Sequence, residues 1–522
     1  MNKLMKKIDR RTLLKWGGLL TVSAMASSAW TNSAGKRYEY TGAVSNSEHF
    51  LHGVASGDPT EKSAIIWTRV TTEEETPLVY WEVALDDAFE QIVSTGYAQT
   101  DESKDFTVKL DVTELNYGRN YAYRFKYRDQ ISPVGRLKLA PQNSTAADTL
   151  KFIVTSCSHF EHGEFVGYRD MVEREQNIDA VIHLGDYSYA SSNSGDYRKF
   201  GYSDFKYDRE SYRARYSEIR KDAFLQQAHQ KHTWMVIWDD GDLRNGVWRE
   251  GPAINGADFH EAMEIAVETF FLWMPIRYIA PKRIWRSVPY GELADIFFLD
   301  MCFYDRDVPI KDMPDNLRKR QPIFEQYDFP GRSIIGQEQA VWFEQAIRTS
   351  TARWRIVCSG APVFEWWDNY SPSAWRAYPQ SHQWLLELFA ELNNNVVVLS
   401  GGLHKAMAAG LALDPFASDY SAGRDNVAVE ITAPSLTRGD GGALWYEVAD
   451  NRSTEKALKK NPHMKFRKGN RAGYLITKFE KDQFVGRWRL YEDVRKISGP
   501  RADTYGDVVS EHGKSKIKVV DS

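Results

Sequence analysis

Residues 151–189 constrain the fold of this chain more than any other stretch. Two short apolar runs, residues 152–154 and 180–184, flank a segment, residues 163–176, in which apolar and charged side chains recur at roughly helical spacing. A strand, a helix and a second strand in this order form the βαβ unit of a parallel sheet. Because chemistry in such sheets gathers at the carboxyl ends of the strands, the residues after each run are the first candidates for a site.

Both strand ends carry side chains that bind metal ions. Cys157 and His159 follow the first run, and Asp186 and Tyr189 follow the second. A thiol, an imidazole, a carboxylate and a phenol all serve as ligands of transition metals. Each residue alone has a plainer interpretation, because a single cysteine is usually inert core and a Gly-Asp pair after a strand is usually a turn.

Two later apolar runs end in comparable clusters. Asp239 and Asp240 follow the third run, with Asn245 shortly after them, and His404 follows the fourth. The twin aspartates could form a charged turn, but the apolar run before them and Asn245 after them favour a metal-binding role. Four such clusters in one region make coincidence a poor explanation.

The length and patterning of the chain predict more than one domain. At 522 residues it is too long for a single ordinary core. Residues 48–140 contain short strands separated by turns, which is typical of a β-sandwich. Residues 150–500 alternate apolar strands with amphipathic helices, the pattern of an α/β domain. We expect strands at residues 64–70, 78–85, 106–112, 121–128, 151–155, 180–184, 233–238, 295–299, 354–358 and 395–399, and helices at residues 211–230, 259–274, 336–349 and 381–394.

Residues 1–30 have the composition of an export signal. A basic start precedes a short apolar run, and Arg10 and Arg11 stand in a segment that resembles the twin-arginine export signal. A different secretory signal with chance arginines, or an uncleaved anchor, would share this composition. The apolar run is too short for a stable membrane anchor, and no other stretch is long and apolar enough. We therefore expect a periplasmic or secreted mature protein without a transmembrane segment.

Charge and cysteine content exclude some classes of protein. The net charge is about −4, so we expect no broad basic face and no nucleic-acid binding. Three cysteines, Cys157, Cys302 and Cys358, are too few for a disulfide framework. We expect Cys302 and Cys358 to be core residues of strands.

The ordered series of segments resembles the PhoD-like alkaline phosphatases (alkaline phosphatase D), a family of metal-dependent phosphoesterases. Residues 53–59 and 66–70 match the opening signature of that family, and residues 155–157, 183–189 and 236–240 match its metal-bearing loops. The resemblance extends from about residue 50 to about residue 490. It implies an N-terminal β-sandwich domain followed by a calcineurin-like metallophosphatase α/β domain.

The same resemblance implies a site that holds a ferric ion with calcium beside it. Matched onto this chain, the iron ligands are Cys157, Asp186, Tyr189 and His404. Asp186 would bridge to a neighbouring metal, Asp240 would lie near the metals, and Asn245 matches a calcium-binding asparagine. The metals would orient a phosphate and generate a nucleophile from water.

The implied protein is an exported hydrolase that uses metal-activated water to cleave phosphomonoesters or phosphodiesters. Its partners would be a small-molecule or lipid phosphoester and the twin-arginine export machinery. His159 has the spacing of an Asp-x-His motif in the wider calcineurin-like enzymes, with Cys157 in place of the aspartate. It could bind a metal or donate a proton to the leaving group, or be a loop histidine bonded to backbone or solvent.

Several positions depart from the family pattern. Gly241 replaces a histidine expected near substrate, and Gly402 replaces a carboxylate that would ligate calcium. Cys302 and Asp305 stand near places where the family often has arginines, and His382 replaces another arginine. Losing a carboxylate weakens a calcium site, and losing arginines removes bidentate phosphate contacts. The alternative is therefore a catalytically impaired pseudoenzyme, or a binding protein, that retains the metallophosphatase fold.

Overall fold

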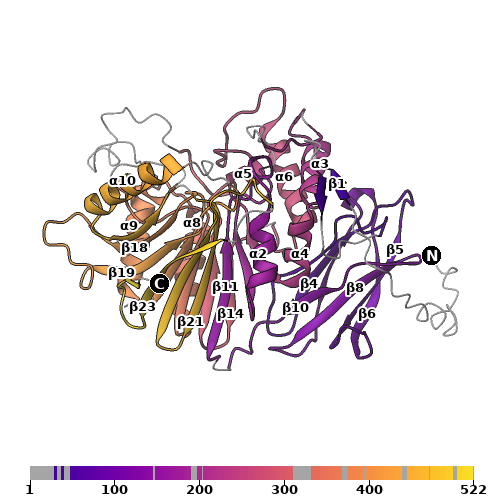
Figure 1. Cartoon of the computed structure of the whole chain (residues 1–522), viewed down its shortest axis with the longest axis horizontal. Helices are drawn as coiled ribbons and strands as arrows, with labels where there is room; N and C mark the ends of the chain where they lie inside the picture. The colour runs from indigo at the N-terminus through magenta and orange to yellow at the C-terminus, as the bar shows by residue number, and fades with distance from the viewer. Residues whose placement is uncertain are drawn as a thin grey trace.

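The chain folds into two stacked β-sheets with helices on the outer face of each (Figure 1). A computed structural model describes residues 29–31, 37–39, 47–144, 147–189, 197–202, 204–281, 283–309, 331–366, 374–392, 395–437, 444–469, 471–497 and 502–520. One apolar cluster fills the space between the sheets and reaches under the helices of one side. A second cluster lies between the other sheet and its own helices. This is a mixed α/β fold, as the sequence predicts.

The larger sheet has ten strands and contains the predicted βαβ unit. Its parallel centre is formed by β11, β12, β13 and β3, and antiparallel strands extend it on both sides. In spatial order its strands are β24 (Lys518–Val520), β23 (Asp503–Glu511), β22 (Gln483–Leu490), β21 (Gly473–Glu480), β11 (Thr149–Thr155), β12 (Ala180–Leu184), β13 (Thr233–Ile237), β3 (Val54–Gly57), β4 (Ala64–Arg69) and β7 (Thr107–Val112).

The second sheet has seven strands, and three of the predicted strands lie side by side in its parallel part. In spatial order its strands are β14 (Arg286–Tyr290), β15 (Ala294–Phe298), β16 (Trp354–Ser359), β17 (Val396–Ser400), β19 (Asn426–Thr432), β18 (Ala406–Ala412) and β20 (Met464–Lys468). Because β12 and β17 end in loops at the same edge of the stack, residues from both sheets can meet there.

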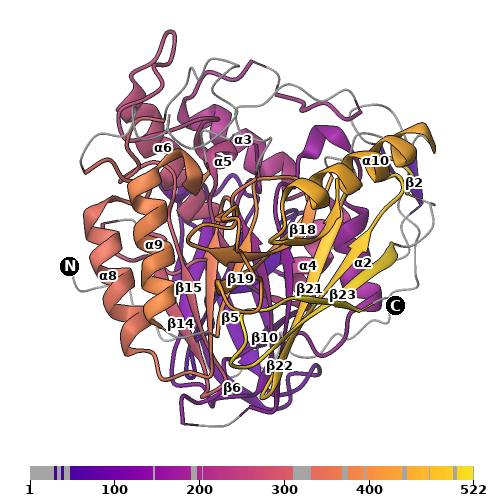
Figure 2. The ribbon, with the colours of Figure 1, turned by 90° about the vertical axis from the view of Figure 1, so that its left-hand side faces the viewer.

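The helices pack in two groups. Those beside the larger sheet are α2 (Val166–Arg174), α3 (Arg209–Ile219), α4 (Ala223–Lys231) and α6 (Phe259–Trp273). Those on the outer face of the second sheet include α8 (Gly336–Thr349) and α9 (Pro379–Glu391), which stand together in Figure 2. The other helices of the described residues are the short α5 (Asp240–Leu243), α10 (Leu444–Lys460), and the 3-10 turns at Glu102–Lys104, Phe160–His162 and Trp375–Ala377.

One predicted helix is wrong. Instead of a single helix over residues 211–230, the chain forms α3 and α4 with a break between them. Asp222 causes this break, because its carboxylate accepts the backbone N–H groups of Phe224 and Leu225 and so begins a new helix. Amphipathic periodicity continues across such a break, so the pattern alone predicts one helix.

The N-terminal region is β-rich, as predicted, but it shares a sheet with the α/β region. A separate small sheet is formed by β10 (Gly135–Lys138), β8 (Asn120–Tyr127), β5 (Leu78–Ala84), β6 (Ile92–Gln99) and β9 (Gln130–Ile131). Its apolar side chains pack in one cluster with those of β3, β4 and β7. The opposite layer of this sandwich is thus the end of the ten-stranded sheet, joined through the pairing of β13 with β3.

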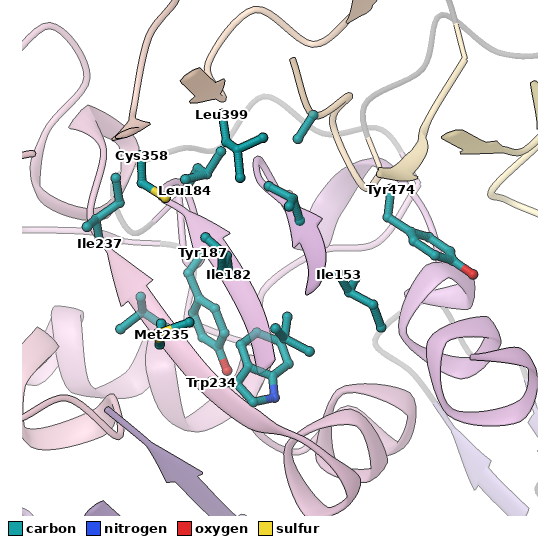
Figure 3. Packing of buried hydrophobic residues seen from close by; sticks show 14 of the residues in the cluster. Ile153, Ile182, Leu184, Tyr187, Trp234, Met235, Ile237, Cys358, Leu399 and Tyr474 are labelled. Atoms are coloured by element: carbon teal, nitrogen blue, oxygen red, sulfur yellow. The ribbon is translucent and has the colours of Figure 1, made fainter. Parts of the chain in front are cut away.

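The core between the sheets explains one of the three cysteines. Figure 3 shows Cys358 of β16 packed near Leu184 and Leu399, which belong to the two facing sheets. Cys358 is fully buried, in agreement with the prediction that it is a core residue.

Before residue 47, the structure describes only residues 29–31 and 37–39. The short strands β1 (Ala29–Thr31) and β2 (Arg37–Glu39) pair antiparallel. Most of the predicted export signal, residues 1–28, lies outside the described residues. Within the described ranges, none of the helices combines the length and the apolar character needed to cross a bilayer.

Candidate metal centre

The four residues predicted to bind iron lie on loops that leave three strand ends. Cys157 follows β11, and Asp186 and Tyr189 follow β12 in the same sheet. His404 follows β17 in the other sheet. The backbone N–H of Cys157 donates to the carbonyl oxygen of Gly185 at 3.0 Å, which holds the first two loops together. The site therefore forms where the two sheets meet at their carboxyl edge.

The structure brings these four side chains into one group. Ligand atoms of Cys157, Asp186 and His404 all lie within 4.8 Å of one another. The Cys157 Sγ is 3.5 Å from Oδ2 of Asp186, and the Tyr189 hydroxyl is 3.1 Å from Nε2 of His404. We call these residues the four-ligand group. A thiol, a carboxyl, a phenol and an imidazole that converge in this way fit a transition-metal ion.

All four members of the four-ligand group have left-handed backbone conformations. Their φ angles are 56° for Cys157, 57° for Asp186, 46° for Tyr189 and 58° for His404. Non-glycine residues adopt this region uncommonly, and such strain persists only where the surrounding structure enforces it. Four strained residues whose side chains converge on one point support a functional role for that point.

A second group consists of carboxylates alone. Ligand oxygens of Asp186, Asp239 and Asp240 lie within 4.8 Å of one another, so Asp186 belongs to both groups. We call these three residues the carboxylate group. Oxygen ligands of this kind suit a hard cation such as calcium or magnesium. The shared Asp186 gives the site the form of two adjacent cation positions with a common carboxylate.

Burial and mutual repulsion make these groups costly to ionise without a cation. Burial and the charges of Asp240 and Asp242 raise the pKa of Asp186 to about 8. Burial, followed by the charges of Asp186 and Asp240, raises the pKa of Asp239 well above its usual range. Burial and Asp186 also raise the pKa of the Cys157 thiol. A bound cation would reverse this balance, because it stabilises each deprotonated ligand.

His159 lies against the four-ligand group but outside it. Its ring is 4.3 Å from the ring of Tyr189 and 4.0 Å from that of His162, between ring centroids. The Nδ1 of His159 accepts the backbone N–H of Glu161 at 3.3 Å, which assigns the ring proton of the neutral form to Nε2. An Nε2 that carries a proton can donate it but cannot ligate a metal. Among the described residues, neither convergent group includes His159.

Asn245, the predicted calcium ligand, is exposed in the turn after α5. The nearby carboxylate of Asp240 accepts the backbone N–H of Gly246 at 2.7 Å. The structure therefore places Asp240 in the carboxylate group and leaves the role of Asn245 a prediction.

Gly241 and Gly402, the two departures from the family pattern, stand where side chains have little room. A Cβ on Gly241 would lie 2.4 Å from Oδ1 of Asp186, which accepts the backbone N–H of Gly241 at 2.8 Å. A Cβ on Gly402 would lie 2.6 Å from the carbonyl oxygen of Gly360, and its φ is +69°. The backbone at both positions is arranged around glycine, so neither the family histidine nor the family carboxylate fits without movement.

Two other departures have structural explanations. Cys302 lies in the loop after β15, not in a strand, and its Sγ is 3.4 Å from Oδ1 of Asp239. The expectation of a strand cysteine is therefore wrong for Cys302. His382 is buried in α9 and its Nε2 lies 2.7 Å from the carbonyl oxygen of Val363, so it anchors a loop.

The sequence favoured a metal-binding role for both Asp239 and Asp240, but it did not single out Asp242. Asp242 accepts the backbone N–H of Ser188 at 2.8 Å and that of Asp239 at 3.1 Å. It thereby fixes the loop after β12 to the loop after β13. The spacing Asp239-x-x-Asp242 at the start of a helix is a capping-box pattern, and this signal could have identified Asp242 as a residue that positions both loops.

Comparison with known proteins decides the family. The model of the family described as "PhoD-like phosphatase" matches residues 152–488, and that of its N-terminal domain matches residues 35–141. The chain belongs to the PhoD-like phosphatase family. Membership in the PhoD-like phosphatase family supports a hydrolase that acts on phosphoesters.

Relatives of this PhoD-like phosphatase agree with the assignment. Alkaline phosphatase D of Bacillus subtilis (strain 168) is 29% identical over 504 residues, which cover 91% of this chain and 82% of the relative. A solved structure of PhoD superposes with a TM-score of 0.80 at 26% identity, covering 92% of this chain and 94% of that one. A purple acid phosphatase from yellow lupin (Lupinus luteus) seeds, at 11% identity and a TM-score of 0.52, covers 87% of this chain and 73% of its own, and shares the fold.

Proposed function

We propose that this chain is an exported, metal-dependent phosphoesterase that hydrolyses phosphomonoesters or phosphodiesters. The observation that carries the proposal is the convergence of Cys157, Asp186, Tyr189 and His404 beside the carboxylate group. Two cation positions that share a carboxylate are suited to phosphoryl chemistry, in which charge develops on several oxygens at once.

The four-ligand group is proposed to hold a ferric ion and the carboxylate group a calcium ion. Carboxylate and phenolate oxygens stabilise the higher charge of ferric iron, and the Cys157 thiolate adds a covalent bond. When bound, such cations polarise a phosphate and lower the pKa of water, so that a nucleophile is available near neutral pH. Asp240 is proposed to contribute to the calcium position, with Asn245 as a further ligand from the adjacent turn.

The protein itself is proposed to supply the proton for the leaving group through His159. Its Nδ1 is occupied by the N–H of Glu161, so the imidazole presents Nε2–H as a donor. A tilted ring contact with Tyr189 places the His159 ring beside the four-ligand group. Protonation of an alkoxide leaving group by a positioned histidine accelerates hydrolysis by about 10²- to 10⁴-fold.

The cellular part of the proposal rests on the N-terminal sequence. Arg10 and Arg11 precede a short apolar run, so we propose export through the twin-arginine pathway to the periplasm or the exterior. The substrate class is a small-molecule or lipid phosphoester.

A test combines elemental analysis of the natively exported protein with hydrolysis of a panel of phosphomonoesters and phosphodiesters. The expected result is one iron per chain, calcium beside it, and hydrolysis that a chelator abolishes. Protein without iron that hydrolyses no member of the panel would refute the proposal.

A second candidate function is a pseudoenzyme or binding protein that keeps one metal. The tight environments of Gly241 and Gly402 favour it, because the site has no room for two groups that the family pattern would supply. Iron content equal to one per chain, without hydrolysis of any panel member, would favour this second candidate over the first.

A further inference from the structure

Glu430 is a carboxylate buried in the centre of a sheet. It lies in β19, between β17 and β18, with no exposed surface. Its side chain shares a face with Ala428, which belongs to the apolar cluster under α8 and α9. Burying a carboxylate in such a place is costly unless it is fully hydrogen-bonded, so a strand of this kind normally carries an apolar residue here.

The partners of Glu430 are two backbone amides and one hydroxyl. Oε2 accepts the N–H of Phe364 at 2.6 Å, and both oxygens receive the N–H of Val363, at 3.0 and 3.2 Å. Oε1 also accepts the hydroxyl of Ser400 at 2.5 Å. Backbone amides only donate, so this arrangement matches an ionised carboxylate, which accepts on both oxygens.

The segment that Glu430 holds lies directly against the carboxylate group. Val363 and Phe364 lie in residues 360–364 of the loop that follows β16. A Cβ on Gly360 would be 3.4 Å from Cγ of Asp239, so this loop touches the side of that carboxylate. The backbone N–H of Gly401 donates to the carbonyl oxygen of Ser359 at 3.1 Å, which joins the same segment to the loop that carries His404.

We propose that Glu430 is a positioning residue for the carboxylate group: it fixes the 360–364 loop and Ser400 so that Asp239 is held in a geometry that binds a cation. Glu430 touches neither a metal ligand nor the substrate, and it acts through the two loops. The inference rests on the proposed function, because it concerns the cation that the carboxylate group would hold.

The ionisation of Glu430 agrees with this role. Burial raises its pKa to about 7, while its hydrogen bonds to Ser400, Val363 and Phe364 pull in the opposite direction. The hydrogen bonds thus favour the charged form in a place where burial alone would neutralise it.

The isosteric variant Glu430→Gln tests the inference with calcium as the probe. The amide keeps the shape of the side chain but replaces one acceptor oxygen with a donor, which faces backbone N–H groups or Ser400. Calorimetric titration of the purified exported protein should show a Kd for calcium about 10- to 100-fold weaker than that of the wild type. Hydrogen exchange at Val363 and Phe364 should be faster in the variant.

Glu175→Gln is the matched control. Glu175 is also a buried carboxylate, but it lies at the end of α2 beside the ten-stranded sheet and pairs with Arg489 at 3.1 Å. Its variant should lose stability while its calcium Kd stays that of the wild type. If Glu430→Gln does not fold, Ser400→Ala removes one donor to the same carboxylate and should weaken calcium binding in the same direction.

The outcomes separate this inference from the proposed function. A wild-type protein that binds calcium, with an unchanged Kd in Glu430→Gln or in Ser400→Ala, overturns the inference alone. Equal weakening by Glu175→Gln also overturns it, because the effect would then be one of general stability. A wild-type protein that binds no calcium contradicts the proposed calcium position itself, and the inference falls with it.

Discussion

Acidic side chains at the two ends of the parallel strands of the ten-stranded sheet have opposite kinds of neighbour. At the edge where the parallel strands begin, Glu175 pairs with Arg489 at 3.1 Å and Asp179 pairs with Lys138 at 2.7 Å. At the edge where they end, the carboxylates of Asp186, Asp239 and Asp240 face one another instead. Where the strands begin, basic side chains of the chain itself neutralise the acidic groups. Where the strands end, the carboxylates repel one another, and a bound cation would relieve that repulsion.

A cavity lies at one end of the parallel strands, away from the candidate metal centre. It measures about 380 Å³ and lies at the edge where the strands begin, between the small N-terminal sheet and the ends of α2 and α4. Glu175, Lys138, Lys231 and His232 are among its lining residues. The residues that line this cavity include none of the ligands of the candidate metal centre, so the convergence of ligand atoms, and not this cavity, identifies that centre.

The substitution Asp186→Asn should have the largest effect at the carboxyl edge. It removes the carboxylate shared by both groups, so hydrolysis should fall about a thousandfold or more and bound iron should be lost. In the metal-free protein it should raise the free energy of unfolding at neutral pH, because asparagine avoids the cost of burying a carboxyl whose pKa is raised to about 8. Activity assays, elemental analysis and urea unfolding measure the three quantities.

Asp179→Asn is the matched change at the other edge. It breaks the pair with Lys138 and weakens the hydrogen bond from the Lys151 N–H, so stability should fall while the rate of hydrolysis stays unchanged. Equal loss of activity in both variants would contradict the division between the edges.

His159→Gln should have the next largest effect. Glutamine cannot serve as the acid, so hydrolysis of an alkyl phosphoester should slow about a hundredfold. A nitrophenyl ester should be nearly unaffected, because its leaving group departs without a proton. His162→Gln is the control, because the His162 ring lies beside that of His159. Equal losses for both esters in His159→Gln would argue against proton donation by His159.

Gly241→Ala should cost about 1–3 kcal/mol of stability and displace Asp186, because the added methyl would overlap Oδ1 of that carboxylate. The iron content of the purified variant should fall with it. Gly201→Ala is the control, since a Cβ there would meet its nearest atom, Oε2 of Glu218, at an ordinary 3.6 Å. A stable, iron-replete Gly241→Ala would show that the helix start at α5 can move freely.

The smallest predicted effect is on the pH dependence of stability, and it concerns His232 near the end where the parallel strands begin. Burial lowers the pKa of His232 from 6.5 to about 4, so the folded state favours its neutral form. Its contribution to stability is complete above pH 6.5 and is lost as the pH falls toward 4. Between pH 7.5 and 5.5 this one group should account for about 1.4 kcal/mol of the loss.

His232→Gln should remove that share of the pH dependence. Urea unfolding of both proteins at the two pH values measures the difference. Parallel curves for wild type and variant would mean that His232 titrates alike in the folded and unfolded states.

The sequence alone predicted most of the strands and the residues at their ends. The βαβ unit appears as β11, α2 and β12, because hydrophobic periodicity is a local property that a single segment carries. The break between α3 and α4 escaped that reasoning, since it depends on how the Asp222 side chain bonds to the backbone. The resemblance to a family supplied the ligand set, whose members the structure then brought together.

What the tertiary structure decided is which distant groups touch. The hydroxyl of Tyr189 meets His404, 215 residues away, only because two sheets stack with their carboxyl edges together. The contact between the loops after β12 and β13 leaves no space for a side chain at Gly241, and the loop after β16 makes Glu430 a buried anchor. Periodicity and spacing describe one segment at a time, whereas steric room, burial and convergence arise between segments, so these properties follow from packing alone.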